Sequence, residues 1–341
     1  MLALSLDMGG THIGCGVVRD DELLGAASLD SELARSLESL LPRIAEILRT
    51  LLKDNGVTAE ECDGIAVGFP GIVDVRNGRI LSTLKKYEDA IHLDLGRWAI
   101  EQFGLSLRME NDARMALLGE QYAGSVRGVQ DVVMITLGTG IGGAIILNGK
   151  IFYGMNGMAG EFGHVTIEPN GVPCGCGNHG CAERYASATA IVRMAREAVE
   201  SGDAPALAKL ASSDAEFSAQ SIYELAIQGN EDAQRIFHRF GQVLGIMLAG
   251  LVNVLNLNMF VIGGGVLSAW DAFAPKMFAE MRERSLIYAA TAPEDSGNDP
   301  LSNKEGASGQ IANYPRNKTI ITRALLGSDA GLYGAARIPV S

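Results

Sequence analysis

Residues 157–187 read GMAGEFGHVTIEPNGVPCGCGNHGCAERYAS, and this stretch organises the rest of the chain. Three of the five cysteines lie here, at Cys174, Cys176 and Cys181, and His164 lies just upstream of them. Three thiolates and one imidazole are the ligands that a four-coordinate structural zinc site requires. The intervening glycines allow turns tight enough to aim the three sulfurs at one point. The stretch therefore predicts a structural zinc site, and a redox-active or unmetallated thiol cluster is the alternative.

Polar side chains accompany this predicted metal site. Glu161 and Glu183 flank the cysteines and can hydrogen-bond a ligand together with the ring of His164. The close C-x-C spacing and the absence of a secretory signal disfavour a disulfide. We therefore interpret the stretch as the zinc-bound floor of a substrate pocket.

Length, composition and charge limit the possible classes of protein. The chain has 341 residues, of which 47% are apolar, so it can form two domains with sizeable cores. No apolar run is expected to reach the roughly 20 residues that cross a bilayer. The net charge of −12 argues against nonspecific nucleic-acid binding, which needs a basic surface. We expect a soluble, cytoplasmic protein that binds neither nucleic acid nor membrane.

A glycine turn follows the first predicted strand. Residues 2–7 form an apolar run, Asp7 ends it, and Gly9, Gly10 and Thr11 come next, before a predicted β-hairpin. The amides of such a turn can face a phosphate, while the carboxylate faces a metal ion or its waters. A plain hairpin turn is an equal alternative for this motif alone.

The same arrangement recurs in residues 131–147, DVVMITLGTGIGGAIIL. An apolar strand meets Gly138, Thr139 and Gly140, and a second strand follows, so this is not the strand-to-helix turn of a dinucleotide site. Two such turns indicate two similar domains that face each other across a phosphate chain. A third glycine cluster, residues 263–265, follows predicted strand 258–262, where it allows a flat ligand to approach or simply connects two elements.

A possible catalytic residue lies where a strand ends and a helix begins. Strand 105–109 leads to Glu110, Asn111 and Asp112, and helix 113–123 follows. Asp112 can be the helix N-cap, or it can be a general base at the edge of a cleft with Asn111 as a ligand-binding neighbour.

The remaining apolar patterns predict mostly helices. A core strand is expected at 64–69, an irregular segment at 76–92, an exposed loop at 290–318 and a strand at 319–323. Helices are expected at 31–54, 94–103, 183–201, 205–212, 218–228, 230–256 and 329–337.

Together these motifs resemble the ROK family of sugar kinases and repressors, within the actin-like ATPase superfamily. The zinc stretch is the most specific part of the resemblance, and the match runs almost from end to end. The resemblance implies an α/β fold of two ribonuclease H-like domains around a central cleft, with a loop stapled by zinc. The smaller domain would comprise 1–112 plus 324–341, and the larger 113–323. Family members usually dimerise, so a homodimer is expected.

The resemblance also implies roles for single residues. Asp112 would be the catalytic base, and Mg²⁺ would accompany ATP near Asp7. Sugar hydroxyls would be held by Asn111, Glu161, His164, Glu183 and Gly71. The zinc ligands would be His164, Cys174, Cys176 and Cys181. ATP would be bound by Asp7, Gly9, Gly10, Thr11, His12, Gly138, Thr139, Gly140, Gly263, Gly264 and Gly265.

The implied reaction is ATP-dependent phosphorylation of a hexose, with glucose at the 6-hydroxyl as the leading substrate. N-acetylmannosamine, N-acetylglucosamine, fructose and allose are alternatives, and a sugar-sensing regulator without a DNA-binding domain is the non-enzyme alternative. Two positions depart from the family pattern. His12 stands where a basic residue is frequent, and residues 84–95, LKKYEDAIHLDL, replace a sugar-contacting Asn-Leu-x-x-Trp segment.

Overall fold

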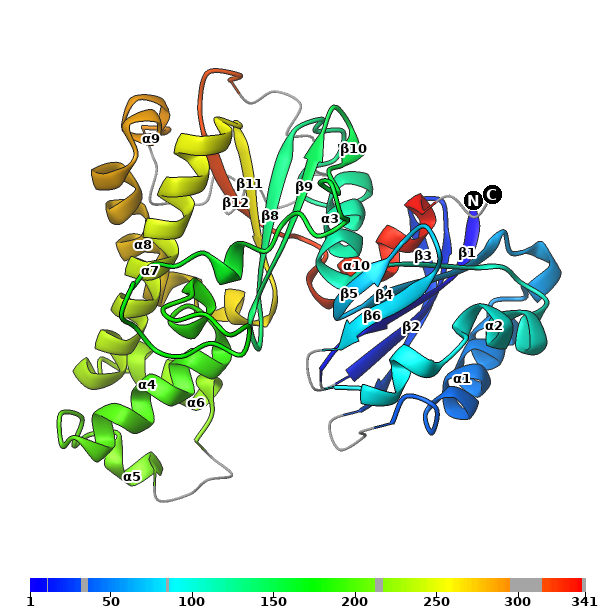
Figure 1. Cartoon of the computed structure of the whole chain (residues 1–341), viewed down its shortest axis with the longest axis horizontal. Coiled ribbons are helices and arrows are strands. Elements are labelled where there is room, and N and C mark those ends of the chain that lie inside the picture. Colours follow the sequence, from blue (N-terminus) through cyan, green and yellow to red (C-terminus); the bar gives the residue numbers. More distant parts are fainter. Residues whose placement is uncertain (11, 32–35, 84–85, 212–216, 295–314, 339–341) are drawn as a thin grey trace.

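Most strands of the described residues form two five-stranded sheets, each in its own lobe (Figure 1). The structure is a computed structural model and describes residues 1–10, 12–31, 36–83, 86–211, 217–294 and 315–338. Thr11, and most of the predicted loop 290–318, therefore lie outside the described residues.

The first sheet has the strand order β3-β2-β1-β4-β7. Strand β2 runs antiparallel to β1 and β3, whereas β4 and β7 run parallel to β1. This sheet comprises β1 (Leu2–Met8), β2 (His12–Arg19), β3 (Glu22–Asp30), β4 (Gly64–Phe69) and β7 (Leu107–Asn111).

The second sheet repeats this plan with the order β10-β9-β8-β11-β12. Again three consecutive strands are antiparallel and two later strands run parallel to the first of them. It comprises β8 (Val132–Leu137), β9 (Ile141–Leu147), β10 (Lys150–Ile151), β11 (Met259–Gly263) and β12 (Ile320–Arg323). The two predicted glycine turns, β1 to β2 and β8 to β9, therefore occupy equivalent places in two units of the same topology.

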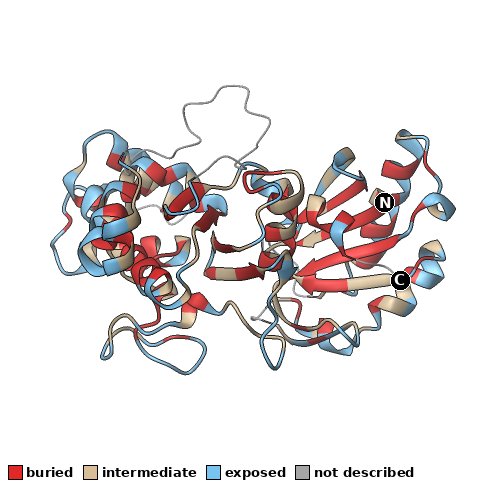
Figure 2. Ribbon diagram, turned by 90° about the horizontal axis from the view of Figure 1, so that it is seen from above, coloured by how far each residue is buried: buried red, intermediate tan, exposed pale blue. Residues whose placement is uncertain are grey.

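Helices cover these sheets with their apolar faces, so the strands are largely buried and the outer helix faces are exposed (Figure 2). The first core packs the sheet against α1 (Leu41–Asp54) and α2 (Leu95–Phe103). The second core is larger and uses α4 (Ala188–Glu200), α6 (Ala219–Ile227), α7 (Glu231–Leu255) and α8 (Trp270–Arg284). Two shorter helices, α5 (Ala208–Ala211) and α9 (Leu286–Thr291), lie in the same lobe. Short 3-10 helices span Ala59–Glu61, Glu88–His92, Phe162–His164, Ala182–Arg184, Gly265–Ala269, Gly327–Asp329 and Ala335–Arg337.

Two helices lie between the lobes and pack closely against each other (Figure 1). They are α3 (Asp112–Tyr122) and α10 (Ala330–Gly334). A β-carbon on Gly119 would lie 2.0 Å from the carbonyl oxygen of Ala330, and one on Gly334 would lie 2.0 Å from that of Met115. Only glycine permits backbones to approach this closely. Helix α10 also contacts β1 and β2, so the end of the chain returns to the first sheet. The division into domains at residues 112 and 323 stays a prediction.

Two sequence predictions about local structure were wrong. Within the described residues the predicted helix 31–54 begins only at Leu41, with Pro42 in its first turn, where proline is favoured, and the Leu37 and Glu38 amides before it donate to the Asp89 carboxylate. The predicted irregular segment 76–92 contains β6 (Arg79–Thr83), which pairs with β5 (Gly71–Asp74) in a two-stranded sheet. The other predicted helices and strands that the structure describes are present, with their ends shifted by a few residues.

Helix α7 is the one helix, among the described residues, that is long and apolar enough to cross a membrane. The sequence reading that no such stretch exists therefore needs correction. Half of the apolar window of α7 is buried inside the structure, where the helix packs against α8. Core helices of soluble proteins have the same length and composition, so this feature alone does not indicate a membrane span.

Candidate active site

A cavity of about 660 Å³ lies between the two sheets. Its walls come from three parts of the chain: the first sheet with the start of α3, the second sheet, and the segment around α10. From these parts it is lined, among others, by Asp7, Gly9, His12, Asp112, Thr136, Gly264, Gly265, Asp329 and Gly331. Residues predicted to act on phosphates and residues predicted to act in catalysis thus share one cavity.

The two glycine turns lie close to each other. The Gly9 amide donates to the His12 carbonyl at 2.9 Å, and the Gly138 amide donates to the Gly140 carbonyl at 3.0 Å, so each turn is closed on itself. A β-carbon on Gly10 would lie 3.9 Å from Thr139 Oγ1. The turns of the two units therefore face each other at van der Waals distance.

The third glycine cluster forms the connection after β11, which has a backbone conformation that favours glycine. Gly264 has φ +93°, in the region that favours glycine, and a β-carbon there would lie 2.4 Å from the Leu137 carbonyl oxygen. Gly264 and Gly265 line the cavity, while Gly263 is the last residue of β11. The backbone thus comes close to the cavity without a side chain in between.

Asn111, and not Asp112, is the N-cap of α3. The Asn111 side-chain oxygen accepts hydrogen bonds from the amides of Ala113 and Arg114, at 3.1 and 3.3 Å. Asp112 is the first helical residue, and its Oδ1 accepts a hydrogen bond from the Ala113 amide at 2.8 Å. Since Asn111 supplies the cap, the Asp112 carboxylate is not needed for capping and lines the cavity.

The two cavity aspartates have raised pKa values. Burial raises the pKa of Asp112 to about 6, against backbone hydrogen bonds that lower it, and the nearby Glu161 adds to the rise. Burial raises the pKa of Asp7 to about 7, with further contributions from Asp112 and Asp329. Desolvation and like charges both disfavour a second negative charge in this small space.

Asp329 was missed by the sequence analysis although it lines the cavity and acts on Asp7. Its position resembles that of Asp112, because it follows β12 and immediately precedes α10. Gly331 lies beside it, and a β-carbon there would lie 2.4 Å from Asp7 Oδ2. The strand-to-helix junction at 323–330 was the signal that could have identified it.

The residues predicted to hold the sugar come together beside the cavity. The Asn111 side-chain amide donates to the Gly71 carbonyl at 3.2 Å, and Asn111, Gly71 and Glu161 line one small pocket. Glu161 Oε2 lies 3.8 Å from His164 Nε2, and Glu183 Oε1 lies 3.7 Å from His164 Nδ1. The imidazole therefore lies between two carboxylates.

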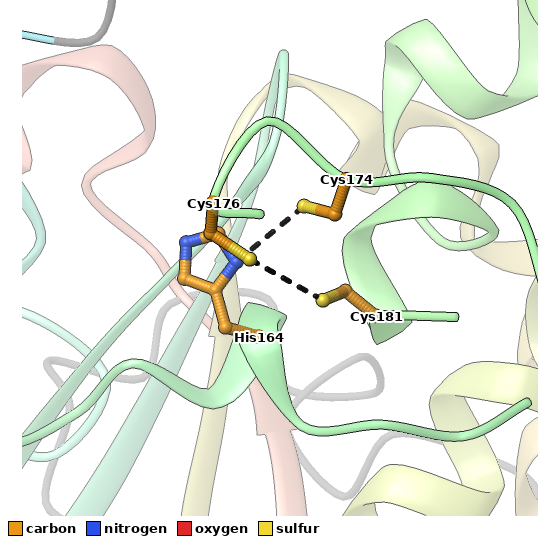
Figure 3. A group of neighbouring side chains, drawn as sticks. All are labelled: His164, Cys174, Cys176 and Cys181. Carbon is orange, nitrogen blue, oxygen red and sulfur yellow. Dashed lines mark hydrogen bonds between the residues drawn. The ribbon is translucent and has the colours of Figure 1, made fainter. Parts of the chain in front are cut away.

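The predicted zinc ligands converge on one point (Figure 3). The ligand atoms of His164, Cys174, Cys176 and Cys181 all lie within 4.8 Å of one another. Two contacts, Cys176 Sγ to Cys181 Sγ and Cys174 Sγ to His164 Nδ1, are each 3.7 Å. A tetrahedral site with zinc–sulfur bonds of about 2.3 Å sets its sulfurs about 3.8 Å apart, so these residues fit a zinc ion.

Glu183 connects this cluster to the second glycine turn. Its Oε1 accepts a hydrogen bond from the Cys174 thiol at 3.1 Å. A β-carbon on Gly140 would lie 2.7 Å from Glu183 Oε2. The amide of Ala188, just beyond Glu183, also donates to the Gly138 carbonyl at 2.8 Å. The Cys/His cluster, the 138–140 turn and the predicted sugar pocket are thus neighbours.

Comparison with known proteins identifies the family. The ROK family profile matches residues 3–317. A glucokinase of Thermotoga maritima is 34% identical over 286 residues, covering 84% of this chain and 87% of that protein. A putative xylose repressor of Caldicellulosiruptor is 30% identical over 84% of this chain and 71% of its own length. The crystal structure of a ROK glucokinase from Streptomyces griseus, in complex with glucose and AMPPNP, is 29% identical, with a TM-score of 0.77 and coverage of 99% and 98%. The two-sheet α/β fold predicted from the sequence is therefore confirmed, and the chain belongs to the ROK family.

Proposed function

We propose that this chain is an ATP-dependent hexose kinase that phosphorylates glucose at the 6-hydroxyl, with Asp112 as general base. The observation that carries the proposal is the common cavity, which Asp112 lines together with Gly9, Gly264 and Gly265. The glucokinases similar to this chain support the substrate class.

In the proposed reaction the sugar hydroxyl oxygen forms a bond to the γ-phosphorus of ATP. The bond from that phosphorus to the bridging oxygen breaks, ADP leaves, and the hydroxyl proton passes to the Asp112 carboxylate. Phosphoryl transfer depends mostly on positioning and charge neutralisation. A pKa of about 6 leaves Asp112 ionised at neutral pH, and makes it a stronger base than an ordinary carboxylate.

The other predicted residues would bind and orient. The amides of the turns at 9–11 and 138–140 would hold phosphate oxygens, as backbone amides do in other anion sites, with His12 beside the first turn. Gly263–Gly265 would approach the adenosine. Asn111, Gly71, Glu161, His164 and Glu183 would hold the sugar hydroxyls.

Two metals are part of the proposal. Magnesium prefers oxygen ligands, and Asp7 with Asp329 offers carboxylates on one wall of the cavity. Mg²⁺ bound there with ATP would neutralise phosphate charge. Zinc held by His164 and the three cysteines would be structural, and it would fix the tautomer and orientation of the His164 ring beside the sugar pocket.

We also propose that the protein is a cytoplasmic homodimer. In each protomer the two lobes would close on the sugar, and the chain would divide into a smaller domain, 1–112 with 324–341, and a larger domain, 113–323. N-acetylmannosamine, N-acetylglucosamine, fructose and allose remain the alternative substrates. The xylose repressor among the relatives keeps a sugar-sensing role as the non-enzyme alternative.

The test is ADP release with MgATP against a panel of hexoses and N-acetylhexosamines, for the wild type, Asp112→Asn and Asp94→Asn. Asp94 is an exposed aspartate at the start of α2, whose cap an asparagine preserves, so it is the matched control. The proposal expects sugar-dependent release that Asp112→Asn abolishes and Asp94→Asn leaves intact. If none of the sugars in the panel caused ADP release, the regulator would be favoured. If Asp112→Asn stayed active, Asp112 would not be the general base.

A further inference from the structure

A buried arginine connects the start of α3 with the loop that carries Glu161. Arg114 lies in the first turn of α3 and is only 4% exposed. Its Nη2 donates to the carbonyl oxygens of Gly157 and Ala159, at 2.6 and 3.1 Å. The guanidinium thus hydrogen-bonds the backbone of loop 152–161 at positions just before Glu161.

Arg114 is itself held by two partners. Glu110, four residues earlier in β7 and 1% exposed, accepts a hydrogen bond from Arg114 Nη1 at 3.3 Å and one from the Asn111 amide at 2.8 Å. The other Glu110 oxygen accepts from the Tyr153 hydroxyl at 2.7 Å. The Tyr153 ring also lies under the guanidinium, with 5.2 Å from Arg114 Cζ to the ring centroid.

The loop has few other anchors. Met155 at its tip is fully exposed, and residues 152–156 are all exposed. A hydrogen bond from the Ala159 amide to the Tyr153 carbonyl closes the loop on itself, at 3.1 Å. Gly160 then packs against β9, where its β-carbon would be 2.4 Å from the Gly143 carbonyl oxygen. Among the hydrogen bonds of the described residues, those from Arg114 are the ones that tie this loop to α3.

This connection joins two parts of the proposed site. Asn111 and Asp112 lie two or three residues before Arg114, and Glu161 lies two residues after Ala159. Asn111, Arg114, Ala159 and Glu161 also line the same small pocket.

We propose that Arg114, supported by Glu110 and Tyr153, is a positioning residue that sets the distance between Asp112 and the sugar-binding Glu161. The inference rests on the proposed roles of Asp112 and Glu161. It predicts that loosening Arg114 weakens sugar binding in particular and leaves ATP binding as it was, since the glycine turns lie on other elements.

The test uses Arg114→Lys, Tyr153→Phe and the control Arg97→Lys. A lysine keeps the charge beside Glu110 but lacks the planar fork that binds a carboxylate and two carbonyls at once. Tyr153→Phe keeps the ring under the guanidinium and removes one hydrogen bond. Arg97 forms an i,i+4 pair with Glu101 as Arg114 does with Glu110, but its side chain is 76% exposed.

For Arg114→Lys we expect the KM for the sugar to rise about tenfold or more, and for Tyr153→Phe about threefold, with the KM for ATP unchanged in both. Arg97→Lys should leave all constants unchanged. Amide hydrogen exchange without any ligand should be faster in residues 153–161 of Arg114→Lys and unchanged in α7.

An unchanged sugar KM with unchanged loop exchange in Arg114→Lys would overturn the inference. An equal rise of both KM values, with faster exchange throughout the chain, would overturn it too, because it would show a merely structural role. Failure of the proposed function is a separate result: the wild type would release no ADP with any sugar, while the exchange experiment would still report on the loop.

Discussion

Asp112→Asn should make the protein more stable at the same time as it removes activity. The pKa of Asp112 is raised from 3.8 to about 6, mainly because the carboxylate is desolvated in the cavity. One pKa unit corresponds to about 1.36 kcal/mol, so the ionised carboxylate costs the folded state at most about 3 kcal/mol. The side chain is partly exposed and water screens it, so we expect a gain of about 1–2 kcal/mol.

The sign of this effect depends on pH. A raised pKa means that the folded state binds the proton more tightly than the unfolded state, so the cost of ionisation is present in full above about pH 6. It declines as the pH falls toward about 4, where the carboxyl is protonated in the folded protein. Asparagine cannot ionise, so the stability gain should be largest near pH 8 and should vanish in acid.

The assay is urea unfolding of the wild type and Asp112→Asn at several pH values from about 4 to 8, with Asp94→Asn as the control. The control should show no such gain, because Asp94 is an exposed N-cap. In parallel, kcat/KM of the wild type should fall below about pH 6, and Asp112→Asn should lose about 10²–10⁴-fold in rate. A variant that is less stable near pH 8, or whose gain does not depend on pH, would refute the reasoning.

Three further predictions concern the Cys/His cluster, the first glycine turn and the contact between the lobes. Cys181→Ser should lower both the zinc content, measured by atomic emission, and the melting temperature, because it removes one of four ligands; a full zinc equivalent in the variant would contradict this. Tyr87→Phe should raise the KM for ATP several-fold with little effect on the KM for the sugar, because the buried Tyr87 hydroxyl donates to the Gly9 carbonyl at 3.0 Å. Steady-state kinetics with ATP or sugar varied in turn tests this, and an unchanged KM for ATP would contradict it. Gly119→Ala should cost about 1–3 kcal/mol or more of unfolding free energy, since the new β-carbon would collide with the Ala330 carbonyl; unchanged urea unfolding would show that the helices move apart freely.

The sequence was most informative where several residue types with one chemical purpose lie close together in the chain. His164 and the three cysteines are such a set, and they do converge in the structure. The positions of the two glycine turns could also be predicted, because each turn follows an apolar strand. In the structure they occupy equivalent positions in two sheets of the same strand order.

Interactions between distant segments could not be predicted in this way. Arg114 lies on a helix whose pattern would allow an exposed arginine, and its loop partners lie more than 40 residues further along the chain. The Asp89 carboxylate accepts hydrogen bonds from the Leu37 and Glu38 amides just before α1, although it lies more than 50 residues further along the chain. Such partners are fixed by the tertiary fold, and hydrophobic periodicity does not contain them.

The segment 84–95, which departs from the family pattern, has a role in the structure that its sequence did not suggest. Tyr87 is fully buried, with φ +56°, and its hydroxyl donates to the Gly9 carbonyl and lies at hydrogen-bonding distance, 2.9 Å, from Ser31 Oγ. Tyr87 thus connects this segment to the first glycine turn, whereas Asp89 binds the amides before α1 and Asp94 caps α2. This is why we expect mutation of Tyr87 to affect ATP more than sugar.

The close contact between α3 and α10 also has a consequence for how the protein is made. Asp329 and Gly331 form a wall of the cavity beside Asp7, yet Asp7 lies on the first strand of the chain. On the ribosome the first sheet is synthesised early, but the wall that completes its cavity is translated only after the whole second lobe. A nascent chain therefore cannot form the complete cavity until residues 329–334 have left the exit tunnel.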